Sequence, residues 1–245
     1  MSAEASTYVP ATPAPSRRRF AVRATLAAAA RALVPTAGIV SLIGIWHLLA
    51  VSGLYSVDQL PGPVDALRAS REAFSEGTLL PNIAASLARF AVAYLAAVAI
   101  AVPLGVFFGL RAAIWKAVDP VVQLLRPISP VAWFPLAVLW LGIGDLPAIA
   151  IIFVAAFYPT LLATVSAVRH VDPIFLRVAR NFGTRPRDVV FKVVIPAAFP
   201  QIAVGLRIAV GAAWVYLVAG EMLGARTGLG FLIIDARNFL RTDLI

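Results

Sequence analysis

The chain has 245 residues, of which 61% are hydrophobic and 13% are charged, and its formal net charge is +9. A soluble domain carries about 25% charged residues, so this composition excludes an ordinary water-facing surface and predicts that lipid surrounds much of the chain. The basic residues fall in a few short segments, which is typical of the cytoplasmic loops of a membrane protein rather than of a nucleic-acid-binding surface. The chain has no cysteine, and its two histidines, His47 and His170, are isolated, so neither a thiol nucleophile nor a metal site is expected.

Residues 1–32 are expected to form a disordered, basic, cytoplasmic tail, because residues 1–16 are rich in Ala, Pro, Ser and Thr and arginines follow up to Arg31. The apolar run 33–54 comes next. A basic stretch before an apolar run is also typical of a signal peptide, but this run is about long enough to span a bilayer and lacks a clear cleavage site. We therefore expect it to be a retained first span.

Four further apolar stretches cover approximately residues 83–110, 118–143, 146–168 and 197–220. Each has about 20 residues or more, which is the length that a spanning helix needs, and a helix satisfies its own backbone hydrogen bonds in lipid. Residues 240–245 look like the entrance to another span. The sequence thus predicts an all-α, polytopic transmembrane helix bundle over residues 33–245, with five spans visible and a sixth expected but cut off.

Loop charges orient this bundle, because cytoplasmic loops carry the excess of Lys and Arg. The segment before the first span is basic, and so is the long polar segment after residue 168. The connection 55–82 carries four acidic residues against two arginines. The N-terminus and the segment after residue 168 are therefore expected to be cytoplasmic, and the connection 55–82 and Asp145 to be external.

Segment 169–196 is the most informative part of the chain. Asp172 is suited to cap a short helix that begins with Pro173, and Gly183 is suited to end it. A second short helix is expected to begin at Pro186. Pro196 and Pro200 are expected to disturb it. Such a compact helical pair suits a partner surface. A DNA-binding module is the alternative, but a position between two membrane spans disfavours it.

The same segment resembles the Glu-Ala-Ala loop of permeases in binding-protein-dependent ABC importers. That pattern is Glu-Ala-Ala, three residues, Gly, nine residues, a hydrophobic residue, any residue, Leu and Pro. Its places are taken here by Arg177, Val178, Ala179, Gly183, Val193, Ile195 and Pro196. The spacing fits throughout, although Arg177 stands in place of Glu and Val178 in place of the first Ala. The resemblance implies that 172–196 is a loop that couples to the ATPase, with Ala179 and Gly183 near the centre of the contact.

Two further stretches, 127–149 and 205–233, resemble the nitrate, sulfonate, taurine and bicarbonate branch of these permeases, and the similarity covers most of residues 60–245. The resemblance implies a permease of the type I ABC importer fold in the bacterial inner membrane, for a small solute such as one of these anions. It also implies a second, identical permease copy, two ATP-binding cassette subunits that hold ATP and Mg, and an extracytoplasmic solute-binding protein. The family usually continues through one more span. No cofactor is expected on this chain, and it contains no Gly-x-x-x-x-Gly-Lys-Ser/Thr phosphate loop, so it is not expected to hydrolyse ATP.

Candidate pathway residues are the arginines in or beside apolar runs, namely Arg207, Arg126 and Arg89. A charged residue inside the bilayer is costly and usually faces a bundle interior or a watery cavity. Arg207 is the best candidate, because it lies roughly two turns past Pro200. The alternative is that these arginines snorkel from helix ends or pair with a carboxylate such as Asp119, and that Glu221 pairs with Arg226.

Two other classes of function remain as alternatives, a polytopic membrane enzyme and a passive channel. An enzyme would need a nucleophile, a base or a metal cluster within the bundle, and the spans contain no such constellation. A channel would work without an ATPase, so association with an ATPase separates it from a transporter subunit.

Overall fold

The computed structural model describes residues 36–56 and 59–244, and its chain divides into two units, Met1–Val64 and Asp65–Ile245. In the first unit, Thr36–Val51 forms an apolar helix within the predicted first span 33–54. The indole Nε1 of Trp46 donates a hydrogen bond to the carbonyl oxygen of Pro61 at 3.1 Å. The predicted tail 1–32 lies outside the described residues.

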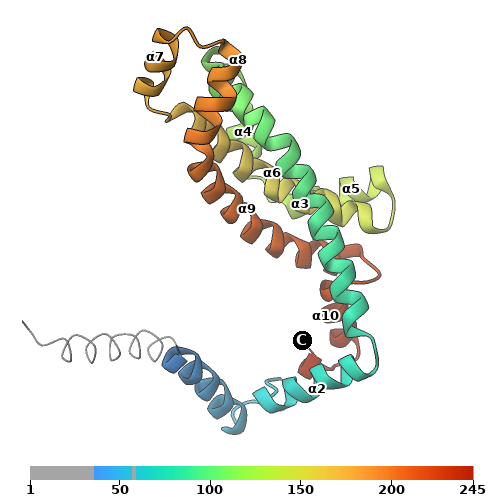
Figure 1. Ribbon diagram of the computed structural model, residues 1–245. Helices are drawn as coiled ribbons and strands as arrows, with labels where there is room; N and C mark the ends of the chain where they lie inside the picture. Colours follow the sequence, from blue (N-terminus) through green and yellow to red (C-terminus); the bar gives the residue numbers. More distant parts are fainter. Residues whose placement is uncertain (1–35, 57–58, 245) are drawn as a thin grey trace, which may run out of the picture. The chain divides into compact units, whose positions relative to one another are not determined.

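The rest of the described chain is a succession of helices, shown in Figure 1. In chain order they are α2 (Pro63–Ser75), α3 (Leu79–Leu110), α4 (Ala112–Leu125), η1 (Pro130–Trp133), α5 (Phe134–Leu141), α6 (Asp145–Arg169), α7 (Pro173–Asn181), α8 (Pro186–Val189), η2 (Val190–Val194), α9 (Ile195–Gly224), α10 (Leu229–Asn238) and η3 (Thr242–Leu244). No strand occurs among the described residues. The all-α class is thereby confirmed.

Three of these helices are long and apolar enough to cross a membrane: α3, α6 and the continuous helix Pro186–Gly224, which contains α8, η2 and α9. They confirm the predicted spans in these regions. The predicted span 118–143 is wrong as a single helix, because α4 and the η1–α5 segment form a pair bent by 85°. Pro127 and Pro130 explain the break, since neither can donate a backbone hydrogen bond and each restricts the residue before it.

Small residues hold the long helices together, and α6 packs extensively against both α3 and α9. A Cβ added at Gly105 of α3 would lie 2.6 Å from the Cβ of Thr164 in α6, and one added at Gly220 of α9 would lie 3.3 Å from the Cα of Ala148. Four alanines are fully buried in the core between these helices: Ala93, Ala97, Ala156 and Ala213. Close backbone approach through small residues is the usual way in which helices associate in lipid.

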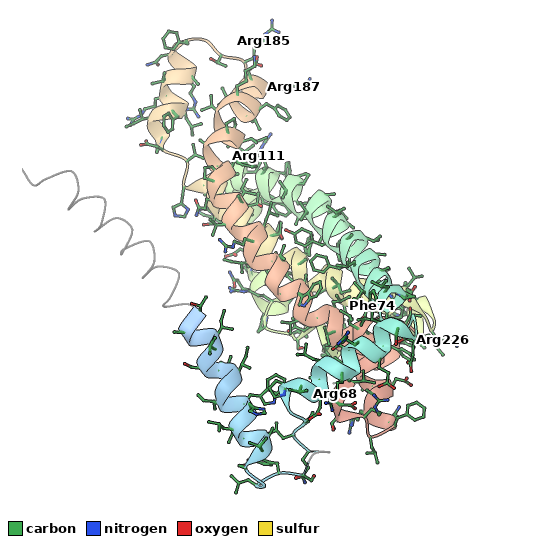
Figure 2. The ribbon with its side chains drawn as sticks, turned by 60° about the horizontal axis from the view of Figure 1, so that its bottom comes forward. Arg68, Phe74, Arg111, Arg185, Arg187 and Arg226 are labelled. Carbon is green, nitrogen blue, oxygen red and sulfur yellow. The ribbon has the colours of Figure 1, made fainter. Side chains whose placement is uncertain are left out.

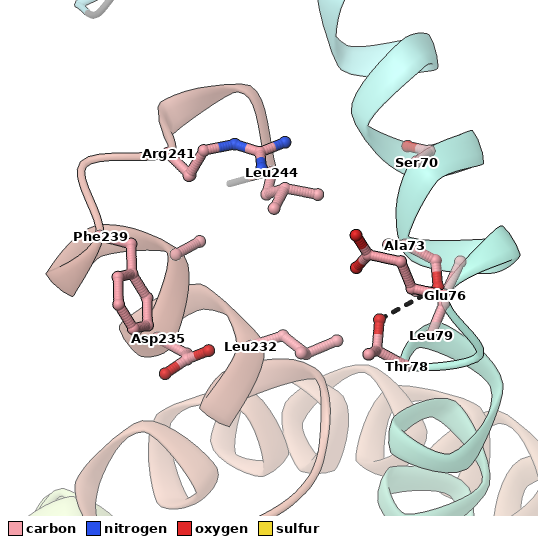
Figure 3. Close-up of a pocket in the computed structure, with 11 residues that line it drawn as sticks. Ser70, Ala73, Glu76, Thr78, Leu79, Leu232, Asp235, Phe239, Arg241 and Leu244 are labelled. Atoms are coloured by element: carbon pink, nitrogen blue, oxygen red, sulfur yellow. Dashed lines mark hydrogen bonds between the residues drawn. The ribbon is translucent and has the colours of Figure 1, made fainter.

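A cavity of about 500 Å³ lies between α2 and the α10–η3 segment (Figure 3). Beside it, Arg241 binds Glu72 of α2 at 2.9 Å and Asp243 at 3.0 Å. The hydrogen bonds from Arg241 hold the pKa of the Asp243 carboxyl below its ordinary value. These contacts fasten the start of η3 to α2, and η3 itself is a short 3-10 turn.

Candidate functional site

The start of α7 has the capping that the sequence predicts. The carboxylate of Asp172 accepts a hydrogen bond from the backbone N–H of Ile174 at 2.8 Å, and Pro173 is the first residue of the helix. A side-chain acceptor at this position satisfies a backbone donor that has no partner within the helix. The loop therefore begins with a defined helix directly after α6 ends.

The end of α7 is closed by Gly183, whose φ of +65° is a conformation that other residues rarely adopt. Its N–H donates to the carbonyl of Arg180 at 2.9 Å, and the N–H of Thr184 donates to the carbonyl of Ala179 at 3.1 Å. This pair of bonds is the Schellman motif, which satisfies the last carbonyls of a helix. The predicted role of Gly183 in ending the first helix is confirmed.

The second half of the loop differs from the prediction. The helix that begins at Pro186 does not end at Pro196 or Pro200 but continues through the π-helical η2 into α9. The N–H of Ile195 donates to a carbonyl five residues earlier. Pro196 has no N–H to donate, and the wider π-helical turn directly before it accommodates that missing donor. The loop is therefore one short helix, α7, followed by an N-terminal extension of the α9 helix.

The positions that match the family pattern divide between surface and interior. Arg177 and Val178 are exposed, whereas Ala179 is only 7% exposed. A Cβ at Gly183 would meet open space. The other pattern positions lie at the η2–α9 junction and are half-buried or exposed: Val193, Ile195 and Pro196. Ala179, expected near the centre of the ATPase contact, has its side chain within the packing of the chain itself.

The exposed surface of α7 is apolar. Ile174, Phe175 and Val178 are each about half exposed, and Phe182, just after the helix, is 84% exposed. Figure 2 shows Arg185 and Arg187 at the tip of the loop, beyond the long helices. Apolar anchors that protrude beside basic residues are typical of a protein–protein contact rather than of a lipid-facing span. We call Ile174, Phe175, Val178 and Phe182 the α7 surface.

Two of the candidate pathway arginines are exposed and unpaired. Arg207 lies midway along α9 on the side that α6 leaves uncovered, and Arg126 lies at the bend after α4. Among the described residues neither forms an ion pair with a carboxylate. Arg126 borders a cavity of about 410 Å³ between α6, α9 and the segment that follows α4, together with Tyr158 and Tyr216. These guanidinium groups are free to pair with an anion.

Arg89 is different, because it is the centre of a buried charge cluster and only 4% exposed. Its Nη1 lies 2.7 Å from Oε1 of Glu221, whose side chain is fully buried, and its Nη2 lies 2.8 Å from Oδ1 of Asp145. The cluster joins α3, α6 and α9 at one end of the bundle. The geometry assigns Arg89 to helix packing rather than to a pathway, and Glu221 pairs with Arg89 instead of the expected Arg226.

The cluster also fixes the turn between α9 and α10. Glu221 accepts a hydrogen bond from the N–H of Gly230 at 2.9 Å, and Arg89 donates to the carbonyl of Thr227 at 2.7 Å. A Cβ at Gly228, whose φ is +115°, would lie 2.5 Å from the carboxyl of Glu221. A helix N-terminus favours a carboxylate, so Glu221 stabilises the start of α10 while it neutralises Arg89.

The order of the predicted spans indicates this cluster, although the charge of each residue taken alone does not. Arg89 lies in the first turns of a span predicted to enter from outside, Glu221 lies directly after a span predicted to leave, and Asp145 lies in an external turn. Topology alone therefore places all three charges at the same face. Charges of opposite sign at one depth in lipid are expected to pair.

Comparisons with known proteins agree with this architecture. Residues 101–245 match the family described as binding-protein-dependent transport system inner membrane component. The taurine transport system permease protein TauC of Escherichia coli is 36% identical over 209 residues, which cover 83% of this chain and 76% of TauC. The putative aliphatic sulfonates transport permease protein SsuC of Bacillus subtilis is 31% identical over 100% of this chain and 87% of its own.

The fold has a counterpart among solved structures. A chain of the MetNI methionine ABC transporter, in an inward-facing conformation, superposes with a TM-score of 0.59 and 22% identity over 68% of this chain and 84% of its own. This likeness supports the helical fold alone. The family match and these relatives show that this chain belongs to the binding-protein-dependent transport system inner membrane components and is a membrane-spanning permease subunit of an ABC importer.

Proposed function

We propose that the α7 surface docks on an ATP-binding cassette subunit in the cytoplasm. The observation that carries this proposal is the exposed apolar face of a helix capped at both ends, on a loop whose basic residues favour the cytoplasmic side. The ATPase holds ATP and Mg, and this chain supplies the docking helix. The N-terminus lies on the same side of the membrane as the loop, and Asp145 and the buried charge cluster lie on the external side.

Motion at α7 has a packed route into the spans. Val171, just before α7, is buried in one cluster with Val168 of α6 and with Val194 and Ile202 of η2 and α9. Leu176 of α7 packs against the same cluster. Because a close-packed core transmits displacement rather than absorbing it, a shift of α7 moves the ends of α6 and α9 together. Closure of the ATPase dimer on ATP thereby alternates access to the pathway.

The pathway lies between two identical permease copies, along the uncovered side of α9. A charged side chain facing lipid at mid-depth costs about 2.5–3.5 kcal/mol, so the exposed Arg207 favours cover by protein and water. A second copy of this chain can cover Arg207 without a different protein, and symmetric dimers are the commonest oligomers.

The solute is a small anion of the sulfonate or nitrate class. Two relatives carry names for taurine and aliphatic sulfonates, and the nitrate import permease protein NrtB of Synechococcus elongatus is 32% identical over 80% of this chain and 73% of its own. The unpaired guanidinium of Arg207 matches such an anion in charge and hydrogen-bonding geometry. An external binding protein delivers the solute to the pathway.

Cysteine cross-linking tests the docking proposal, because the chain has no native cysteine. Val178→Cys and Ala179→Cys are adjacent, one exposed and one buried. We expect Val178→Cys to cross-link to a cysteine-bearing ATPase in the assembled complex and Ala179→Cys not to do so. A complex that assembles and transports but whose ATPase cross-links only through Ser70→Cys of α2 would contradict both the docking surface and the orientation.

Transport by the reconstituted complex tests the pathway and the solute. Uptake of taurine, an alkanesulfonate, nitrate and bicarbonate is compared for Arg207→Gln, Arg207→Lys and the control Arg68→Gln, an exposed arginine of α2. We expect Arg207→Gln to reduce anion uptake at least about tenfold, the order that one buried charged hydrogen bond supplies, while ATPase stimulation by the binding protein persists. Wild-type uptake by both Arg207 variants would remove Arg207 from the pathway.

A further inference from the structure

A second cavity, of about 670 Å³, lies under the coupling loop, on the side of α7 that faces the membrane spans. Its walls come from the ends of α3 and α6, from α7, and from the segment Pro186–Val194. Part of its apolar wall belongs to the cluster that connects α7 to the spans. We call it the loop cavity.

Three arginines border the loop cavity, each from a different element: Arg111 directly after α3, Arg169 at the end of α6 and Arg180 in α7. Among the described residues none of them forms an ion pair. The two carboxylates of the loop are engaged elsewhere, since Asp172 caps α7 and Asp188 binds Lys192 at 2.9 Å. The loop cavity is therefore a basic site without an internal counter-ion, and it is complementary to an anion.

The rest of the wall is apolar, and it includes Val168, Leu176 and Val194, which belong to the core beneath the loop. The cavity lies where two spans end, since α3 ends at Leu110 and α6 ends at Arg169. This is the depth of lipid headgroups. A small inorganic anion needs only the charges, whereas a phospholipid needs charges at the mouth and apolar walls below, and the cavity has both.

We propose that the loop cavity binds the phosphate headgroup of an anionic phospholipid from the cytoplasmic leaflet. Basic pockets between helices on this side of a membrane are suited to such headgroups. The lipid would bridge Arg180 of α7 to Arg111 and Arg169 at the span ends, and so hold the docking helix at a fixed distance from the bundle. The choice of leaflet rests on the proposed cytoplasmic position of the loop, but binding itself does not depend on docking or transport.

Lipid binding is measured with the assembled complex in nanodiscs of phosphatidylcholine containing a small fraction of spin-labelled phosphatidylglycerol or spin-labelled phosphatidylcholine. The test variant is Arg111→Gln/Arg180→Gln, and the matched control is Arg185→Gln/Arg187→Gln, which removes the same charge from the loop tip, outside the cavity. We expect the preference for phosphatidylglycerol over phosphatidylcholine to fall by roughly fivefold for each arginine removed from the cavity. The control should keep most of that preference.

Several results would overturn the proposal. An equal loss in the two double variants would reduce the effect to general surface charge, and an unchanged preference in the cavity variant would exclude the site. Displacement of the labelled lipid by excess inorganic phosphate at matched ionic strength would indicate a site for free phosphate. Weaker association of the ATPase with the cavity variant, without any change in lipid preference, would instead assign the cavity to the ATPase contact. Arg180→Gln alone, on an exposed position of α7, repeats the measurement if the double variant does not assemble.

Discussion

Replacing Glu221 by Gln should destabilise the permease strongly. The change keeps the shape of the side chain but removes the charge that neutralises Arg89 at 2.7 Å. The single amide oxygen of Gln can accept a hydrogen bond from Arg89 or from the N–H of Gly230, but not from both. The NH₂ group of Gln then faces the other of these two donors and cannot accept its hydrogen bond. Removing one partner of a buried ion pair costs about 3–5 kcal/mol, and Asp145 remains to hold part of the arginine charge, so we expect about 3 kcal/mol.

The assay is thermal unfolding of the purified permease in mild detergent, followed by tryptophan fluorescence. For a chain of this size a loss of 3 kcal/mol corresponds to a lower Tm by roughly 6–12 °C. Asp145→Asn is the matched control, because it contacts the same arginine but its side chain is 60% exposed. Asp145 is exposed although Arg89 is buried, and a solvated carboxylate contributes less than a buried one, so this control should shift Tm less than Glu221→Gln does.

A double-mutant cycle makes the reasoning refutable. In Arg89→Gln/Glu221→Gln the uncompensated charge is gone, so the double variant should be less destabilised than the sum of the two single variants. Strict additivity would show that the two side chains do not stabilise each other. Equal Tm shifts for Glu221→Gln and Asp145→Asn would show that burial does not govern the strength of these contacts.

Three further predictions concern single positions. Gly183→Asn should keep more ATP-driven uptake than Gly183→Leu, because Asn adopts a φ near +65° at a lower cost than the bulkier Leu; equal losses would place Gly183 in the ATPase contact itself. Gly205→Ala should lower stability by about 1–3 kcal/mol in thermal unfolding, because its Cβ would overlap α6, whereas Gly211→Ala, which meets open space on the same helix, should be neutral. Arg241 holds the pKa of Asp243 below its ordinary 3.8, so Asp243 stays ionised and bound to Arg241 above pH 3.8, and this contact should slow hydrogen exchange of amides 239–244. The protection should disappear only as the pH falls through the lowered pKa, and Asp243→Asn should abolish this pH dependence.

The sequence predicted best those structural features that depend only on residues close together along the chain. The cap at Asp172 and the helix end at Gly183 follow from local backbone chemistry, and both are found in the structure. The three long spans follow from the length of their apolar runs. Prolines within apolar runs were harder to interpret, because Pro103 and Pro159 lie inside continuous helices whereas Pro127 and Pro130 break one. A single proline costs one hydrogen bond, which neighbours can replace, but two prolines three residues apart also restrict the residues between them.

Contacts between distant residues could be predicted only in outline. The pairing of Arg89 with Glu221 joins helices more than 130 residues apart in sequence, so hydropathy predicts the shared membrane face but not the partner. The inward position of Ala179 depends on which side of α7 packs on the spans, and a family pattern does not contain that information. The positions of Arg126 and Arg207 as exposed, unpaired cations were compatible with the sequence but equally compatible with snorkelling or pairing.

The two ends of the bundle differ in what they can transmit. At one end, the buried charges of Arg89 and Glu221 tie the ends of α3 and α9 to the turn before α10. At the other end, α7 packs on α6 and α9 through an apolar cluster. The apolar cluster transmits the displacement of α7 to both helices, whereas separating the buried ion pair would leave charges in a low dielectric. We therefore expect movement of the coupling loop to tilt α6 and α9 about the charge cluster, so that the end with the cluster acts as the pivot and the end beside α7 makes the larger excursion.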